Sequence, residues 1–138
     1  MSIPFLTLLG LLGIYFLLRG LSRGRTPEPA TDPDAATLAE LVRVGSDVTR
    51  EHDVEFFLYL PGRAEAEVLA EQLAGEGFKT EIQPGEAAGD WLCLATRRLR
   101  PELDELRRLR ARLAILAESR GGAYDGWGAT VVEPGSVE

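Results

Sequence analysis

Few residues in this chain are of the types that carry out chemistry. Cys93 is the only cysteine and His52 the only histidine, so a zinc site or a serine–histidine–aspartate triad would depend on these two residues, and neither lies in a recognisable motif. His52 lies between Glu51 and Asp53 and could belong to a proton relay, but a lone histidine at a strand start is more typical of a solvated or capping residue. Cys93, inside an apolar strand, is most simply a small core residue. With no glycine-rich phosphate loop either, we predict no catalytic residue, metal ligand or cofactor site, and hence no enzyme.

One stretch stands out, GGAYDGWGATVV at residues 121–132. Gly126 and Gly128 flank Trp127, which indicates a bulge or a close backbone approach inside a strand. Two interpretations are open. In the first, Trp127 packs in the core or at an edge and Asp125 caps a local turn. In the second, the segment binds a partner through four residues, Tyr124, Asp125, Gly126 and Trp127.

The start of the chain is apolar. Residues 3–18, IPFLTLLGLLGIYFLL, carry no charge. With Met1 and Ser2 the stretch has 18 residues, the short end of what crosses a hydrocarbon core about 30 Å thick. A cleaved signal peptide is the alternative, but no basic residue precedes the stretch and no A-x-A-like site follows it. The positive-inside rule predicts a single-pass anchor with its N-terminus outside and the remaining chain in the cytoplasm, because three arginines follow closely: Arg19, Arg23 and Arg25.

Composition indicates one globular domain behind that anchor. The chain has 138 residues and a net charge of −7, which argues against a general nucleic-acid binder because duplex affinity comes from Lys and Arg. A single cysteine suits a reducing compartment. Residues 22–33 contain three prolines and read as an extended tether. We therefore expect an anchor, a linker, a domain and a short tail at residues 1–21, 22–33, 34–134 and 135–138.

The pattern of the domain predicts a helix followed by the order βαββαβ. The first helix begins at Asp32-Pro33, ends at Gly45 and has Leu38, Leu41 and Val42 on its apolar face. Strands are expected at residues 53–61, 78–83, 90–96 and 123–132, and helices at 62–77 and 101–120, where Gly121-Gly122 ends the last one. Two such βαβ halves predict an α+β, ferredoxin-like sandwich: a four-stranded antiparallel sheet with two helices on one face. The strands beginning at Asp53 and Asp90 should lie in the middle.

Charge is unevenly distributed between the two long helices. Residues 97–120 hold eight basic and four acidic side chains, whereas residues 62–77 hold one Arg and four Glu. Attraction between neighbouring helices explains this pattern, and so does an electropositive docking surface. Four arginines would carry that surface: Arg107, Arg108, Arg110 and Arg112.

Three aromatic residues suggest a further possibility. Phe57, Tyr59 and Trp91 could be exposed on the open face of the sheet, where RNA-recognition domains stack bases. The matching RNA-binding motif is absent, and the strands carry acidic rather than basic residues. Packing under the helix at residues 34–44 explains the same aromatic residues without RNA.

The soluble part resembles the regulator of ribonuclease activity B family, the ribonuclease E inhibitor proteins. The matching stretches are GSDVTREHDVEFFLYLP, LAEQLAGEGFKTEI and LAESRGGAYDGWG, with EP at residues 133–134. The YDGW block is the most specific of them. The resemblance implies a ferredoxin-like fold and a protein that binds the endonuclease ribonuclease E and lowers its activity. The described inhibitor is soluble, whereas this chain carries the expected anchor.

Taken together, we expect a regulator tethered to the bacterial inner membrane that binds an RNase E-type nuclease through the YDGW segment and the basic helix. Two alternatives are a single-stranded RNA-binding module and a structural membrane-associated protein in which the domain is only a spacer.

Overall fold

The computed structural model of the protein describes residues 32–135. The expected anchor at residues 1–21, nearly all of the linker at 22–33 and the end of the tail lie outside the described residues. Within residues 32–135, no helix combines the length and the apolar character needed to cross a membrane.

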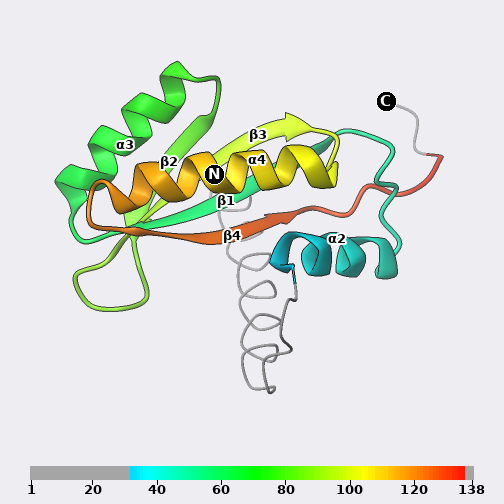
Figure 1. Cartoon of the computed structure of the whole chain (residues 1–138), viewed down its shortest axis with the longest axis horizontal. Helices are drawn as coiled ribbons and strands as arrows, with labels where there is room; N and C mark the ends of the chain where they lie inside the picture. The colour runs from blue at the N-terminus through cyan, green and yellow to red at the C-terminus, as the bar shows by residue number, and fades with distance from the viewer. Residues whose placement is uncertain (1–31, 136–138) are drawn as a thin grey trace, which may run out of the picture. The chain divides into compact units, whose positions relative to one another are not determined.

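Three helices and a four-stranded sheet make up the described domain (Figure 1). All the strand pairs are antiparallel, and the strands lie in the order β2-β3-β1-β4. This confirms the α+β class, the order helix then βαββαβ, and the central position of the strands that start near Asp53 and Asp90. The elements are α2 (Pro33–Arg43), β1 (His52–Leu60), α3 (Arg63–Gly75), β2 (Lys79–Pro84), β3 (Trp91–Leu99), α4 (Leu103–Glu118) and β4 (Ala123–Ala129).

The central strand β1 supplies the middle of the core. It pairs with β3 over its whole length, from His52 opposite Leu99 to Leu60 opposite Trp91. Because side chains alternate along a strand, its even-numbered residues point to one face of the sheet. That face is fully buried through Val54, Phe56, Leu58 and Leu60.

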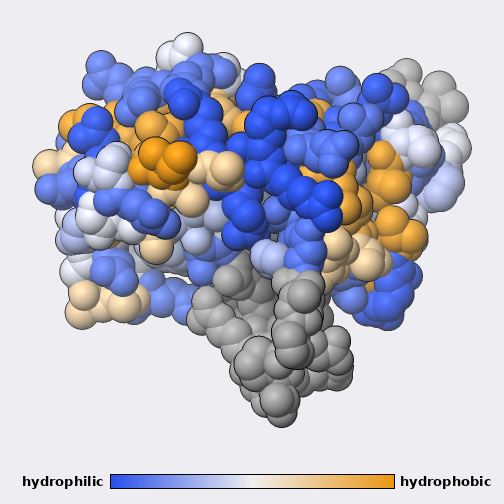
Figure 2. Space-filling view, viewed as in Figure 1, coloured by the Kyte–Doolittle hydropathy of each residue, from blue (hydrophilic) through white to orange (hydrophobic). Residues whose placement is uncertain are grey.

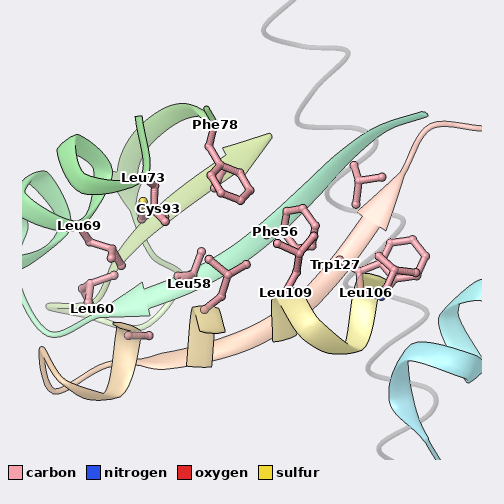
Figure 3. Packing of buried hydrophobic residues seen from close by; sticks show 14 of the residues in the cluster. Phe56, Leu58, Leu60, Leu69, Leu73, Phe78, Cys93, Leu106, Leu109 and Trp127 are labelled. Atoms are coloured by element: carbon pink, nitrogen blue, oxygen red, sulfur yellow. The ribbon is translucent and has the colours of Figure 1, made fainter. Parts of the chain in front are cut away.

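Helices α3 and α4 cover this same face. Their buried side chains form one cluster with those of β1 (Figure 3). The contributing residues recur at three- and four-residue intervals, which places them on a single stripe of each helix. The leucine stripe of α4 therefore packs against the sheet. It consists of Leu106, Leu109, Leu113 and Ala117, and α3 adds Ala66, Leu69 and Leu73.

The first helix, α2, packs against β4 and α4 at one side of the sheet (Figure 1). It begins at Pro33 as expected and ends before Gly45, whose φ is 97°. Leu41 is buried and Leu38 partly buried, but Val42 is 50% exposed. Placing Val42 on the packed face was therefore wrong, because the contact takes up only a narrow stripe of the helix.

Candidate functional site

The YDGW segment lies in β4, and its two large aromatic residues both face the helices. Tyr124 is opposite Leu58 and Trp127 is opposite Phe56 in the pairing with β1. Trp127 is only 1% exposed and belongs to the core cluster. Tyr124 packs against that cluster from a half-buried position. Core packing of Trp127, one of the two interpretations from the sequence, is the one found here.

A β-bulge makes this arrangement possible. Residues 124 and 127 are an odd number of positions apart, so in a regular strand their side chains would point to opposite faces. The pairing of β4 with β1 shifts between Phe56 and Leu58, and there β4 accommodates an extra residue. Gly126 lies in the bulge with φ 112°, a conformation that residues with a side chain rarely adopt. The predicted irregularity is thus confirmed, and its consequence is that both aromatic rings reach the core side.

Arg110 of α4 is the predicted arginine that contacts this segment. Its guanidinium carbon lies 5.1 Å from the centre of the Tyr124 ring. The same guanidinium donates two hydrogen bonds to Asp34 of α2, Nε to Oδ2 at 2.9 Å and Nη2 to Oδ1 at 3.0 Å. The Asp34 side chain is completely buried, and it lies in the first turn of α2, where a negative charge is favoured. One arginine therefore joins α2, α4 and β4.

The other three predicted arginines lie along α4 and form ion pairs with nearby carboxylates. Arg107 and Arg108 reach Asp104 and Glu105 of their own helix, at 3.7 Å and 2.6 Å. These are exposed pairs of the kind that contributes little to stability. Binding of a partner by any of the predicted site residues stays a prediction.

Arg112 instead bridges α4 to the end of α3. It donates two hydrogen bonds to Glu76, at 2.9 Å and 2.5 Å. These hydrogen bonds hold the pKa of the Glu76 carboxyl below its ordinary value and raise the pKa of Arg112. Attraction between the acidic and basic helices, one of the two explanations of their opposite charge, is therefore present in at least this pair.

His52 was expected to be either a solvated or a capping residue, and because it is buried, the solvated alternative was wrong. The residue is 0% exposed, with Nε2 2.6 Å from the Ser46 hydroxyl and Nδ1 2.9 Å from the Arg50 carbonyl oxygen. A carbonyl only accepts, so Nδ1 carries the proton, and in the neutral ring Nε2 accepts from Ser46. Ser46 in turn accepts the N–H of Val132 at 2.8 Å. Because Val132 lies 86 positions after Ser46, the sequence around Ser46 and His52 gave no sign of these hydrogen bonds.

The Ser46–His52 pair has the polar contact that activates a serine nucleophile, but its surroundings suit a structural role. Ser46 is 7% exposed, and its oxygen already accepts a main-chain N–H. Nδ1 of His52, the ring nitrogen that does not contact Ser46, faces a main-chain carbonyl, whereas a catalytic triad has a carboxylate there. Asp47 adds a hydrogen bond from its N–H to the Val132 carbonyl at 2.7 Å. Together these bonds clasp the segment after β4 to the loop after α2.

The proposed row of exposed aromatic residues is not present. Trp91 is opposite Leu60 and so faces the helices, where Arg63 lies 5.4 Å from its ring centre. Phe57 is opposite Leu94 on the other face and is only 1% exposed. The packing explanation also needs correction, because α2 lies against β4 and α4. The pairing register, which the sequence does not reveal, separates these rings.

Metal and thiol chemistry find little support in the described domain. Among residues 32–135, no group of three or more His, Cys, Asp or Glu side chains is arranged to hold a metal ion. Burial raises the pKa of the Cys93 thiol to about 11. Because the thiolate is the reactive form, Cys93 is inert at neutral pH, which agrees with its predicted place in the core.

Comparison with known proteins bears on the domain as a whole. No curated protein matches the chain significantly. Residues 31–129 match the family model described as regulator of ribonuclease activity B. The matched range contains every helix and strand from α2 to β4 and more than half of the chain. The protein therefore belongs to the regulator of ribonuclease activity B family.

Proposed function

We propose that this protein binds an RNase E-type endoribonuclease and lowers its activity by protein–protein contact, without catalysis of its own. The family match over residues 31–129 carries the proposal, because it covers the entire set of described helices and strands. The buried, structural roles of the few chemically active side chains support it.

We place the protein at the inner face of the bacterial inner membrane. The support is in the sequence: residues 3–18 carry no charge and are followed by Arg19, Arg23 and Arg25. Such an anchor would hold the domain close to the membrane and raise its effective concentration toward a partner bound to the same membrane.

The outer side of α4 is the surface we assign to the first contact. Arg108, Arg112 and Ile115 are spaced by four and three residues and share one side of the helix. The two arginine side chains are 66% and 55% exposed, and Ile115 is 67% exposed. Figure 2 shows a largely hydrophilic surface on this side of the molecule, interrupted by small hydrophobic areas. An exposed isoleucine beside two arginines suits an acidic partner segment with one apolar side chain.

The test is inhibition of RNA cleavage by the full-length protein in lipid nanodiscs. We expect the protein to lower the cleavage rate of a purified RNase E-type nuclease, and we expect Arg108→Glu combined with Arg112→Glu to abolish this effect. Arg63→Glu, an equally exposed arginine on α3, is the matched control and should still inhibit. A cleavage rate unchanged by excess wild-type protein refutes the proposed function.

Fluorescence anisotropy with labelled single-stranded RNA separates this function from direct RNA binding. We expect no binding even at low salt, where phosphate contacts are strongest. Salt-sensitive RNA binding by the wild-type protein would show instead that the domain acts on the RNA.

A further inference from the structure

Strand β2 forms one edge of the sheet, and among the described residues β3 is its only neighbouring strand. An edge strand presents main-chain N–H and C=O groups to which another strand can pair, and many proteins guard such edges with charged residues or proline. Lys79 and Glu81 are exposed on β2, and Pro84 ends it. Whether these residues guard the edge or specify a partner depends on which groups point outward.

The main-chain groups of Thr80 and Ile82 point away from β3. Gly85, the residue after Pro84, donates its N–H to the carbonyl of Asp90, just before β3, at 2.7 Å. Backbone groups alternate in an antiparallel pair, so the odd-numbered residues of β2 bond to β3 and the even-numbered ones face outward. Pro84 agrees with this phase, because a proline is tolerated where the N–H would face solvent at an edge. The edge therefore presents the N–H and C=O groups of Thr80 and Ile82 to a second strand.

The two exposed charges of β2 are two positions apart and opposite in sign. When two copies of this strand pair antiparallel about a two-fold axis at Thr80, Lys79 of each copy lies opposite Glu81 of the other. The outward backbone groups also match in this register, since Thr80 faces Thr80 and Ile82 faces Phe78 of the other copy. Displacing one strand by two residues puts Glu81 opposite Glu81. Like charges along the edge would repel a second copy, whereas Lys79 and Glu81 attract one.

The neighbouring helix α3 leaves room for this pairing. It packs over β2 and β3, and the Ala70 carbonyl on its β2 side accepts a hydrogen bond from the Thr80 hydroxyl at 3.3 Å. Ala74 is exposed and lies one turn later on the same side. With strands about 4.8 Å apart, the α3 helices of two paired copies would lie about 10 Å apart. Helices pack at about 8–10 Å when the side chains between them are small, as these two alanines are.

We propose that β2 is the interface of a homodimer, in which two copies pair these edge strands antiparallel about a two-fold axis at Thr80 and form one continuous sheet. Main-chain hydrogen bonds at Thr80 and Ile82 and ion pairs between Lys79 and Glu81 join the copies, and the α3 helices lie side by side. Because α3 and α4 cover one face of the sheet, both copies turn their basic helix to the same side of the dimer. A partner with two acidic segments would then be bound with avidity.

Sedimentation equilibrium of the full-length protein in density-matched detergent tests this dimer. Wild-type protein should show a monomer–dimer equilibrium. Lys79→Glu and Glu81→Lys each place like charges opposite each other, so each should weaken dimerisation at least about tenfold. Mixing the two variants should restore dimerisation to within about threefold of wild type, because every pair between the two different copies then joins a positive and a negative side chain.

Matched variants separate the interface from general effects of charge and size. Glu86→Lys makes the same change of charge at an exposed residue in the turn after β2 and should leave dimerisation unchanged. Ala74→Arg fills the space between the two α3 helices and should weaken dimerisation at least about tenfold. Val68→Arg, at a 47% exposed residue on another side of α3, should not. Urea midpoints check that each variant is folded.

Three results would overturn the proposal. Wild-type protein that is monomeric even at about 1 mM has no such interface. A dimer that neither charge reversal weakens forms through another surface, such as the apolar segment at residues 3–18. If both reversals weaken the dimer but mixing them does not restore it, the pairing of Lys79 with Glu81 is wrong. The proposed function stands or falls separately, by inhibition of the nuclease.

Discussion

Gly122, between the end of α4 and the start of β4, is where a single added methyl group should disturb the fold most. A Cβ at this position would lie 2.1 Å from the Tyr59 carbonyl oxygen and 2.8 Å from Leu60 Cδ1. The first contact involves a backbone atom, which cannot rotate away. The segment at Gly122 and the segment at Tyr59 must therefore move apart by about 0.9 Å for this distance to reach 3.0 Å. That movement acts against the pairing of Ala123 with Tyr59 and the hydrogen bond from Gly122 N–H to the Ala117 carbonyl, which is 2.8 Å long.

The expected cost of Gly122→Ala is the sum of these effects. Forcing extra volume into a packed site costs about 1–3 kcal/mol, and each weakened backbone hydrogen bond about 0.5–1.5 kcal/mol. We therefore expect a loss of about 3 kcal/mol in the free energy of unfolding, which lowers Tm by about 12 °C or more in a domain of this size.

Two other glycines serve as matched controls. Gly121 has φ 77°, but its nearest neighbour, Pro61 Cγ, would lie at an ordinary 3.6 Å from a Cβ. Gly121→Ala should therefore cost only the conformational strain, about 1–2 kcal/mol. Gly75, at the end of α3, has open space where a Cβ would lie, with nothing within 4 Å, so Gly75→Ala should stabilise the protein by about 0.5–1 kcal/mol.

Urea unfolding followed by far-ultraviolet circular dichroism measures all three variants on the full-length protein. The expected order of stability is Gly75→Ala, wild type, Gly121→Ala, Gly122→Ala. If the free energies of unfolding of Gly122→Ala and Gly121→Ala agree within experimental error, the close approach of Gly122 to Tyr59 is not the reason for a glycine here, and the reasoning is wrong.

Three further predictions concern charged and polar contacts, all read from urea midpoints. Burial and the charges around it raise the folded-state pKa of Glu55, so the folded state binds the proton more tightly and stability falls as pH rises through that pKa; Glu55→Gln should therefore stabilise at pH 7 and lose this advantage in acid. The pKa of Glu76 is lowered by Arg112, so their stabilisation is present above the unfolded pKa and is lost as pH falls; Arg112→Gln should therefore lower stability at neutral pH and flatten the acid part of the pH profile. Ser46→Ala leaves His52 Nε2 and a main-chain N–H without their partner and should cost about 1–3 kcal/mol; wild-type protein should also resist labelling by a fluorophosphonate, and labelling at Ser46 would contradict the structural role.

Parts of the fold could be predicted because their patterns repeat. The alternation around Phe56 and Leu58 in β1 and the leucine spacing in α4 each define a face, and burial of that face needs no distant information. The two glycines around Trp127 likewise predicted an irregular strand, and β4 has a bulge at this point. The fourth strand nevertheless ends at Ala129, before the predicted Val132, because the residues after it pair with the loop at Ser46 and Asp47 instead of with β1.

The misplaced residues share a different cause. Trp91 was considered for the same face of the sheet as Phe57 and Tyr59, but register decides the face, and register depends on which residues of β1 and β3 are opposite each other. His52 looked solvated because its neighbours in sequence are charged, whereas its hydrogen-bond partner lies six residues earlier, across a turn. For the predicted arginines, sequence gave the sign of the charge but not the carboxylate that each one meets.

Sequence by itself determined the apolar segment at residues 3–18, the order of elements and the family, because periodicity, composition and short motifs are local properties of a chain. The tertiary structure decided what the YDGW segment is. Its tryptophan is a core residue, its bulge turns two aromatic rings to one face, and Arg110 joins it to a carboxylate 76 positions earlier. Contacts between residues so far apart in the sequence depend on how α2, α4 and β4 pack together. That packing depends on the side chains of all three elements and cannot be read from any one of them.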